Sequence, residues 1–354
     1  MTASRDSSAD VQARVADAVE GRTPLVIIGG GTKHFLGREM LGEPLVLTGH
    51  CGVVDYYPEE LVLTARSGTP VAELEALLAE HDQMFAFEPP HLGAGATLGG
   101  TIAANLSGPR RPYAGAARDF VLGVRIVNGR GEIIRFGGEV MKNVAGYDLS
   151  RLMAGAMGTL GVILDVSLKV LPRPSEEVTL VQPLALRDAI ETLCRWAARP
   201  LPISASCIEN GRLYVRLSGT SSALAKARPI IGGDELPDAD SFWQDVREQR
   251  RPFFGGDSPL WRMSLPPTAL PELPGEQLIE WGGALRWLRS GAQAASIRAA
   301  AAEHGGHAML FRAPERADAP YHPLPEPLMR LHKRIKDAMD PQHIFNRGRM
   351  YPEL

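Results

Sequence analysis

Three glycine-rich loops in the first half of the chain constrain its fold more than any other feature. They are GGGT at 29–32, HLGAGATLGGTIAANLSG at 91–108 and GAMGTLGV at 155–162. Glycine permits positive φ angles and a close approach of the backbone, so that successive N–H groups form a nest for an anion. In any one loop the glycines could instead mark a turn. Three such loops, each beside a predicted strand or helix end and each with a threonine, favour a site for a diphosphate.

The residue order in the first loop bears on which nucleotide could bind. A P-loop requires Gly-Lys-Ser/Thr, but Lys33 follows Thr32 and precedes His34. The fingerprint G-x-G-x-x-G begins at Gly29 but meets His34 where the third glycine belongs. The sequence therefore disfavours both P-loop ATP chemistry and a Rossmann NAD site.

Composition excludes several classes of partner. A length of 354 residues predicts two domains, and a net charge of −3 argues against nucleic acid as the main partner. Cys51, Cys194 and Cys207 are too scattered for a disulfide framework, a zinc knuckle or an iron–sulfur cluster. No signal peptide and no apolar segment of about 18 residues is present. We therefore expect a cytoplasmic protein without an integral membrane segment, held at the inner membrane, if at all, through its partners.

The hydrophobic pattern predicts an α+β protein with a domain boundary near Pro172 and Pro174. The first domain spans 10–173 and includes a predicted hairpin at 120–137 around Asn128-Gly129. The second, 174–325, begins strand–helix–strand–strand–helix, which predicts a sheet covered by helices on a single face. The tail, 326–354, is one predicted helix that ends at Asp340-Pro341.

The order of the three loops resembles the vanillyl-alcohol oxidase/p-cresol methylhydroxylase (PCMH) superfamily of FAD proteins. Members carry a GGGT-like loop, then P…GATLGG…N…G, then GYDL…G…GTLGV, which match 29–32, 89–108 and 146–162 here. The segment DPQHIFNRGRMY at 340–351 is similar to the superfamily's closing DP…NPG, with Arg347 in place of the proline. Such an ordered set is far more specific than any single motif.

A closer resemblance, over nearly the whole chain, is to the glycolate oxidase FAD-binding subunits (E subunits). It rests on HLGAGATLGGTIAANLSGPRRPYAGAARDFVLG, KNVAGYDLSRLMAGAMGTLG and EHGGHAMLFRAP. The resemblance implies a two-domain PCMH-type FAD-binding fold with an α+β cap domain. It also implies an oxidoreductase of glyoxylate metabolism that oxidises a small 2-hydroxy acid, glycolate, to glyoxylate. The expected partners are a second flavoprotein subunit and an iron–sulfur subunit that receives the electrons.

The same resemblance implies which residues bind FAD. Those of the first and second loops would surround the pyrophosphate, and those of the third loop would lie at the adenosine or ribityl half. The full set is Gly29, Gly30, Gly31, Thr32, Lys33, Thr97, Gly99, Gly100, Asn105, Gly158, Gly161 and Val162. For Lys33 a solvated surface position is the alternative, for Asn105 a capped turn, and for the third loop a helix–strand packing contact. Relatives with a histidyl link carry His where Thr32 stands, so non-covalent FAD is predicted.

Catalytic residues are less well defined. Arg110 and Arg111 follow the second loop, where a guanidinium could bind a substrate carboxylate in a bidentate manner. A solvated loop or a contact with a partner subunit is the alternative for both, and packing or helix capping is the alternative for Tyr147. Neither His304 nor His307 belongs to the His-x-Gly-Asp-Gly-Asn type motif of single-chain relatives, and no general base is identified.

Two other functions therefore stay open. One is a self-sufficient FAD-dependent 2-hydroxy-acid dehydrogenase, and the other is a non-catalytic subunit that binds flavin for structure or electron relay.

Overall fold

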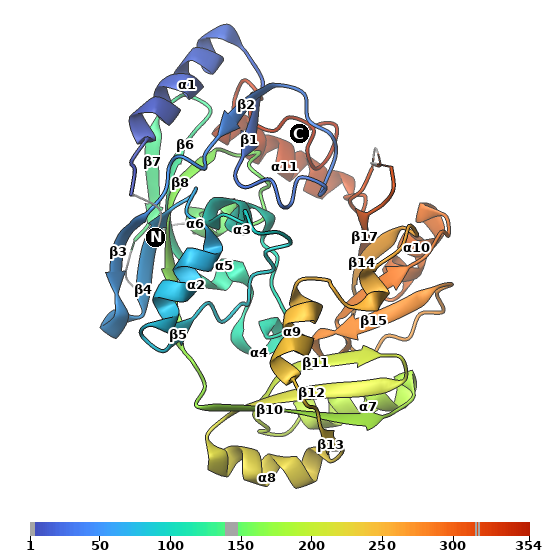
Figure 1. The fold of residues 1–354 in the computed structure, drawn as a ribbon. Coiled ribbons are helices and arrows are strands. Elements are labelled where there is room, and N and C mark those ends of the chain that lie inside the picture. Colours follow the sequence, from blue (N-terminus) through green and yellow to red (C-terminus); the bar gives the residue numbers. More distant parts are fainter. Residues whose placement is uncertain (1–3, 139–147, 316, 318) are drawn as a thin grey trace. The chain divides into compact units, whose positions relative to one another are not determined.

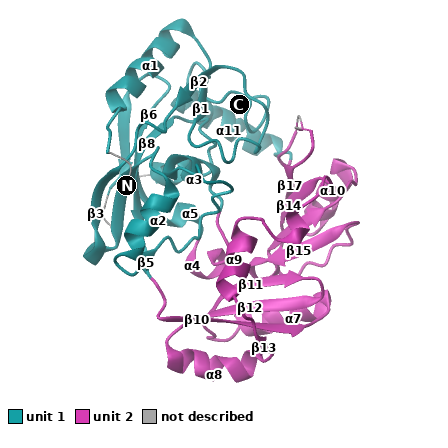
Figure 2. Ribbon diagram, in the orientation of Figure 1, with its two compact units in different colours: residues 1–106, 116–172, 323–354 teal, residues 107–115, 173–322 magenta. Residues whose placement is uncertain are grey.

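The computed structural model describes residues 4–138, 148–315, 317 and 319–354, and it divides into two compact units (Figure 2). Unit 1 comprises residues 1–106, 116–172 and 323–354, and unit 2 comprises 107–115 and 173–322. The segment 107–115 thus belongs to unit 2, whereas the sequence pattern placed it in the first domain. Its contacts explain this, because the Trp281 indole N–H donates to the Gly108 carbonyl at 3.0 Å.

Unit 1 is built on a five-stranded antiparallel sheet in the order β3-β4-β8-β6-β7 (Figure 1). Two further pairs are β1–β2, which is parallel, and β5–β9, which is antiparallel. The strands are β1 (Leu25–Ile28), β2 (Glu43–Val46), β3 (Val53–Tyr57), β4 (Val62–Arg66), β5 (Gln83–Met84), β6 (Val121–Val127), β7 (Ile133–Gly137), β8 (Val162–Lys169) and β9 (Leu171–Pro172). The helices are α1 (Ser8–Gly21), α2 (Val71–Ala79), α3 (Leu98–Ala104), α5 (Ala117–Phe120), α6 (Leu149–Met153) and α11 (Glu326–Met339).

The two ends of the chain share one core in unit 1. Helix α1 buries Val11, Val15 and Ala18, which recur every three or four residues on one face. They pack in a cluster that includes Leu25 of β1 and Phe345 of the tail. The predicted hairpin is confirmed as β6 and β7, and the predicted tail helix is confirmed as α11.

Unit 2 is an eight-stranded sheet in the order β13-β10-β12-β11-β15-β16-β14-β17. Its strands are β10 (Glu176–Pro183), β11 (Ile203–Glu209), β12 (Arg212–Gly219), β13 (Asp234–Glu235), β14 (Leu260–Ser264), β15 (Glu276–Glu280), β16 (Leu285–Arg289) and β17 (His307–Arg312). Its helices are α4 (Arg111–Ala114), α7 (Leu186–Ala197), α8 (Ser221–Ile231), α9 (Ala239–Arg247) and α10 (Ala294–Glu303). The predicted strand–helix–strand–strand–helix order is confirmed by β10, α7, β11, β12 and α8.

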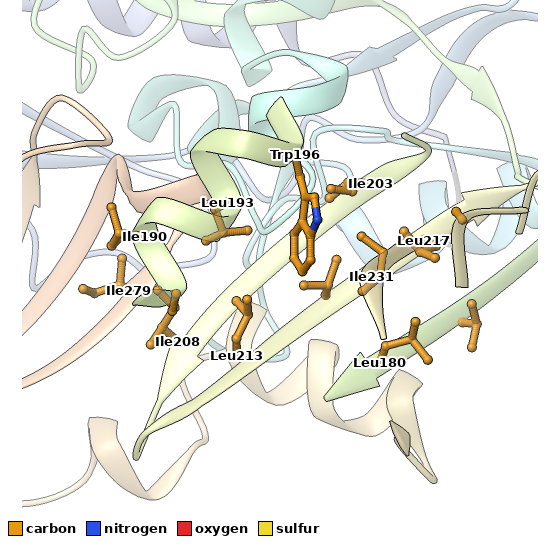
Figure 3. Close-up of a cluster of buried hydrophobic side chains, with 14 of the residues drawn as sticks. Leu180, Ile190, Leu193, Trp196, Ile203, Ile208, Leu213, Leu217, Ile231 and Ile279 are labelled. Carbon is orange, nitrogen blue, oxygen red and sulfur yellow. The ribbon is translucent and has the colours of Figure 1, made fainter. Parts of the chain in front are cut away.

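One face of this sheet packs on α7 and α8, where Ile190 and Leu193 of α7 lie over Ile208 and Leu213 (Figure 3). The prediction that the helices of this module cover a single face is confirmed for α7 and α8, whereas the later helix α9 lies on the other face. The Trp243 indole N–H of α9 donates at 2.8 Å to the hydroxyl of Thr179, which points away from the α7 side.

Candidate functional site

The three glycine loops of unit 1 surround one groove. It consists of two adjoining open pockets, with empty space of about 570 and 420 Å³ that includes open solvent, and the two share residues from all three loops. The predicted cofactor residues that line it are Gly29, Gly30, Gly31, Thr32, Lys33, Thr97, Gly99, Gly100, Gly158 and Gly161. The second and third loops thus converge on the loop that follows β1, as the ordered motifs predicted.

The first two loops touch through their backbones. A Cβ atom at Gly30 would lie 1.4 Å from the Gly95 carbonyl oxygen, so only glycine permits this approach. At Gly31 the backbone has φ 74°, and a Cβ atom there would meet no protein atom within 4 Å. The backbone at Gly31 therefore borders the open space of the groove, in a conformation that favours glycine.

Side chains of the first two loops are held in place by short-range contacts. The Thr97 hydroxyl accepts from the Gly100 N–H and caps α3. Lys33 is buried, and its ammonium group donates to the His91 carbonyl at 3.1 Å. The alternative of a solvated Lys33 is therefore wrong, and a positive charge lies in the lining of the groove.

Two predicted residues do not line the groove. Asn105 is the left-handed C-cap of α3, and its side-chain oxygen accepts from the Arg118 N–H at 3.1 Å. Val162 begins β8 and is buried in the cluster beneath α1. Tyr147, at the start of the third motif, is outside the described residues.

The lining also includes residues that were not predicted, among them Ile27, Met157, Asn346 and Arg349. Asn346 and Arg349 lie in the closing motif DPQHIFNRGRMY. Its similarity to a superfamily segment was the available signal, but the motif does not show by itself which of its residues contact a cofactor. Ile27 lies two residues before Gly29, and Met157 lies within the third loop, directly before Gly158; apolar residues in those positions do not by themselves indicate a binding site.

The two candidate catalytic arginines have different environments, both within unit 2. Arg110 is 7% exposed, forms a 2.5 Å ion pair with Glu177 and donates to the Ser218 hydroxyl. Burial alone would raise the pKa of Glu177, but the nearby Arg216 and Arg110 guanidinium groups hold it below its usual value. The charge of Arg110 is thus already compensated inside the protein.

Arg111 instead lies over the Trp281 ring, with its Cζ 4.4 Å from the ring centroid. The Cζ of Arg262, on β14, is 5.2 Å from the same centroid. Burial and the neighbouring Arg111 lower the pKa of Arg262 to about 10, and Glu280 opposes this shift. Two guanidinium groups therefore contact one indole, an arrangement that an anion would stabilise.

Glu280 offers only partial compensation there. It is 4% exposed and accepts from the Trp287 indole N–H at 2.8 Å. The Arg262 guanidinium also lies 6.0 Å from the Trp287 ring, yet among the described residues it forms no hydrogen bond and no ion pair. This second site, on the sheet of unit 2, therefore has the chemistry to bind a small carboxylate.

Within the described part of the chain, no group of three or more His, Cys, Asp and Glu side chains could hold a metal ion. His304 is bonded through its ring to the Ala300 carbonyl, and burial, Arg262 and His322 lower the pKa of His307. Cys51, Cys194 and Cys207 are free thiols. No helix among these residues has the length and apolar character needed to cross a membrane.

The groove fits an extended dinucleotide. The Gly31 backbone borders open space in the groove, and the buried Lys33 ammonium group is part of the lining. Apolar residues line the groove beside the third loop. Such a combination of an anion nest and an apolar wall suits a diphosphate that bridges two ring systems.

Comparisons with known proteins agree with this geometry. Residues 3–137 match the family described as FAD binding domain. Across 97% of this chain and 76% of the other, the fold superimposes on alkyldihydroxyacetonephosphate synthase with a TM-score of 0.68 at 14% identity. The family match and the fold together define an FAD-binding protein with the PCMH-type fold and an α+β second domain, as predicted.

The relatives narrow this class. Glycolate oxidase subunit GlcE of Escherichia coli K12 is 49% identical over 350 residues, which cover 99% of each chain. Glycolate oxidase subunit GlcD of Bacillus subtilis 168 is 33% identical over 55% of this chain and 42% of its own length. A D-lactate dehydrogenase of Archaeoglobus fulgidus is 32% identical over 57% and 46%. The chain belongs to the GlcE family.

Proposed function

We propose that this chain is the FAD-binding subunit of an enzyme that oxidises glycolate to glyoxylate. The 49% identity to GlcE over the full length carries the proposal, and the groove of unit 1 supports it. The FAD domain is unit 1, which covers residues 10–172 except 107–115 and includes the tail 326–354, and the cap is unit 2. When bound, FAD accepts the hydride equivalent that leaves the hydroxyl-bearing carbon of the substrate.

The chain's own residues bind and orient the cofactor in this proposal. The loop Gly29–Lys33 and the residues Thr97, Gly99 and Gly100 hold the diphosphate through N–H groups, a hydroxyl and one ammonium charge. Gly158 and Gly161 line the groove, and the third loop holds the remaining half of the cofactor there. Attachment is non-covalent, because Thr32 stands where histidyl-linked relatives carry His. Asn105 and Val162 act only through packing and capping.

The substrate carboxylate is held in unit 2. Arg262 is the principal ligand, because its guanidinium lacks a carboxylate partner in the described chain, and Arg111 adds a second positive charge on the same indole. Arg110 does not contact the substrate but anchors the segment 107–115 through its ion pair with Glu177. A bidentate arginine–carboxylate contact both binds and orients a small hydroxy acid.

The test for this role is the variant Arg262→Gln. We expect the KM for glycolate to rise at least tenfold in the assembled enzyme, while the FAD content stays unchanged. Arg195→Gln is the matched control, because Arg195 lies exposed on α7, on the other face of the sheet. An unchanged KM in Arg262→Gln would remove Arg262 from the substrate site.

Activity depends on partners in this proposal. We infer a complex with a second flavoprotein subunit and an iron–sulfur subunit, in the cytoplasm or held peripherally at the inner membrane by those partners. The purified chain should bind FAD yet reduce a dye acceptor with glycolate only negligibly, and co-expression with both subunits should restore turnover. Full dye-linked activity of the chain alone would show instead a self-sufficient dehydrogenase. A complex that keeps its turnover after this chain's FAD is lost would make this subunit non-catalytic.

A further inference from the structure

The C-terminal tail contacts the backbone of two glycine loops at the wall of the groove. Asn346 is 4% exposed and lies 319 residues from Ile27 along the chain. Its side-chain oxygen accepts from the Ile27 N–H at 2.8 Å, and its side-chain nitrogen donates to the Met157 carbonyl at 2.6 Å. One amide thus joins the strand that leads into the first loop to the start of the third.

This orientation of the Asn346 amide is fixed by its partners. A backbone N–H requires an acceptor and a carbonyl requires a donor, so that only one placement of the oxygen and nitrogen satisfies both. Gly158 follows Met157, and a Cβ atom there would lie 2.6 Å from the Asn346 side-chain nitrogen. The glycine in the third loop is therefore required by the amide that lies behind it.

Arg349 makes the corresponding contact at the far end of the first loop. It is 4% exposed, and its guanidinium donates to the Lys33 and His34 carbonyls at 3.3 and 3.2 Å. The Arg349 backbone carbonyl in turn accepts from the Arg38 N–H at 2.8 Å.

A buried ion pair anchors the tail that carries these residues. The Lys336 ammonium group donates to the Asp340 carboxylate at 2.6 Å, to the Thr159 carbonyl at 2.7 Å and to the Phe345 carbonyl at 3.0 Å. These contacts use all three of its protons. The Asp340 carboxylate in turn accepts from the N–H groups of Ile344 and Phe345. The tail is therefore bonded to the third loop at Thr159 as well as at Met157.

We propose that Asn346 and Arg349 are positioning residues that set the affinity for FAD by holding the first and third glycine loops in register. This inference rests on the proposal that FAD occupies the groove. Glycine loops lose much conformational freedom when they become ordered, so a fixed contact from the tail lowers the cost of binding. By linkage, bound FAD must stabilise the tail to the same extent as the tail favours FAD.

The variant Asn346→Asp tests this role. It keeps an oxygen for the Ile27 N–H but sets a second oxygen against the Met157 carbonyl. We expect FAD to bind at least tenfold more weakly and to dissociate faster, with the Tm of the apoprotein within a few degrees of wild type. The matched control is Asn210→Asp, because Asn210 has a similar left-handed backbone, φ 51°, in an exposed turn of unit 2. Loss of Tm with an unchanged FAD affinity would overturn the proposal and leave Asn346 a purely structural residue.

Hydrogen exchange distinguishes a positioning role from a direct contact with FAD. In the apoprotein, Asn346→Asp should speed exchange of the Met157 and Thr159 amides, whereas a residue that only touches the ligand would leave them unchanged. In wild type, FAD should slow exchange of the Ile344 and Phe345 amides, and no slowing there would overturn the proposal.

A third variant separates this proposal from the assignment of the groove. If Gly30→Val keeps FAD, the groove itself is wrong. If Gly30→Val loses FAD while Asn346→Asp binds it like wild type, only the role of the tail is wrong.

Discussion

Replacement of Gly30 by alanine should abolish tight FAD binding without unfolding the protein. The added Cβ would lie 1.4 Å from the Gly95 carbonyl oxygen, so the two loops must move apart by about 1.6 Å to reach even the 3.0 Å limit of real Cβ contacts. The oxygen belongs to backbone and has no rotamer with which to move aside. A misplacement of about 1 Å in a preorganised site costs on the order of 100-fold. We therefore expect the Kd for FAD to rise by at least about 100-fold, or about 2.7 kcal/mol.

Two other glycines provide the comparison. Gly31→Ala introduces no protein clash but places a side chain at φ 74°, which costs roughly 1–2 kcal/mol, and its methyl group enters the groove. Gly31→Val adds β-branching at that angle and should abolish binding. Gly49→Ala is the control, because a Cβ there meets no atom within 4 Å and the residue is outside the groove lining.

The measurement is FAD titration of the deflavinated variants by flavin fluorescence, with the apoprotein Tm determined in parallel. The expected order of affinity is Gly49→Ala equal to wild type, then Gly31→Ala, then Gly30→Ala and Gly31→Val. Wild-type affinity in Gly30→Ala would refute the assignment of the first two loops to the diphosphate. A Tm loss of the same size in all variants would show that general destabilisation causes the effect.

Three further outcomes are expected. Flavin should leave the protein on acid precipitation; if it stays and His34→Ala releases it, the cofactor is linked to His34, which lines the groove. Arg110→Glu should lower the Tm, because it sets two carboxylates together at Glu177, whereas Arg111→Glu should spare the Tm and weaken substrate binding or copurification of partners. Hydrogen bonds from Ser8 lower the pKa of Asp6 from 3.8 to about 2. This stabilisation is present above pH 4 and is lost as the pH falls through 2. Asp6→Asn should therefore lower the free energy of unfolding at pH 7 by about 1 kcal/mol, discounted for the half-exposed carboxylate, and urea titrations at pH 7 and pH 2 measure the difference.

Local features of the fold were predictable because each depends on a short stretch of sequence. The spacing of Val11, Val15 and Ala18 defines a helix face, and Asn128-Gly129 defines a hairpin turn. The glycine loops were recognisable for the same reason. Helix α9 was not, because its buried face consists of Phe242, Trp243 and Val246 within a polar stretch, too few apolar residues to reveal a period.

Site residues supplied from distant parts of the chain could not be predicted in this way. Buried Lys33 donates to the His91 carbonyl, 58 residues away in the chain. Buried Arg349 donates to carbonyls more than 300 residues away. The neighbours Arg110 and Arg111 look alike in sequence, yet one is paired with Glu177 and the other lies on Trp281. Which partner each residue meets is decided by the strands of unit 2, and a single sequence does not reveal that pairing.

The buried Lys336–Asp340 pair illustrates how such a site is maintained. Burial lowers the pKa of Lys336, and Asp340 opposes this shift, so the charged pair is a poor source of net stability. An apolar pair of similar volume could fill the space, but it would leave the Thr159 and Phe345 carbonyls without their donor. Those carbonyls belong to the third loop and to the residue before Asn346, so the pair fixes one register of the tail against the groove. We therefore infer that the Lys336–Asp340 pair serves to select one position of the tail and does not add net stability. The third loop is rich in glycine and cannot fix that position by itself.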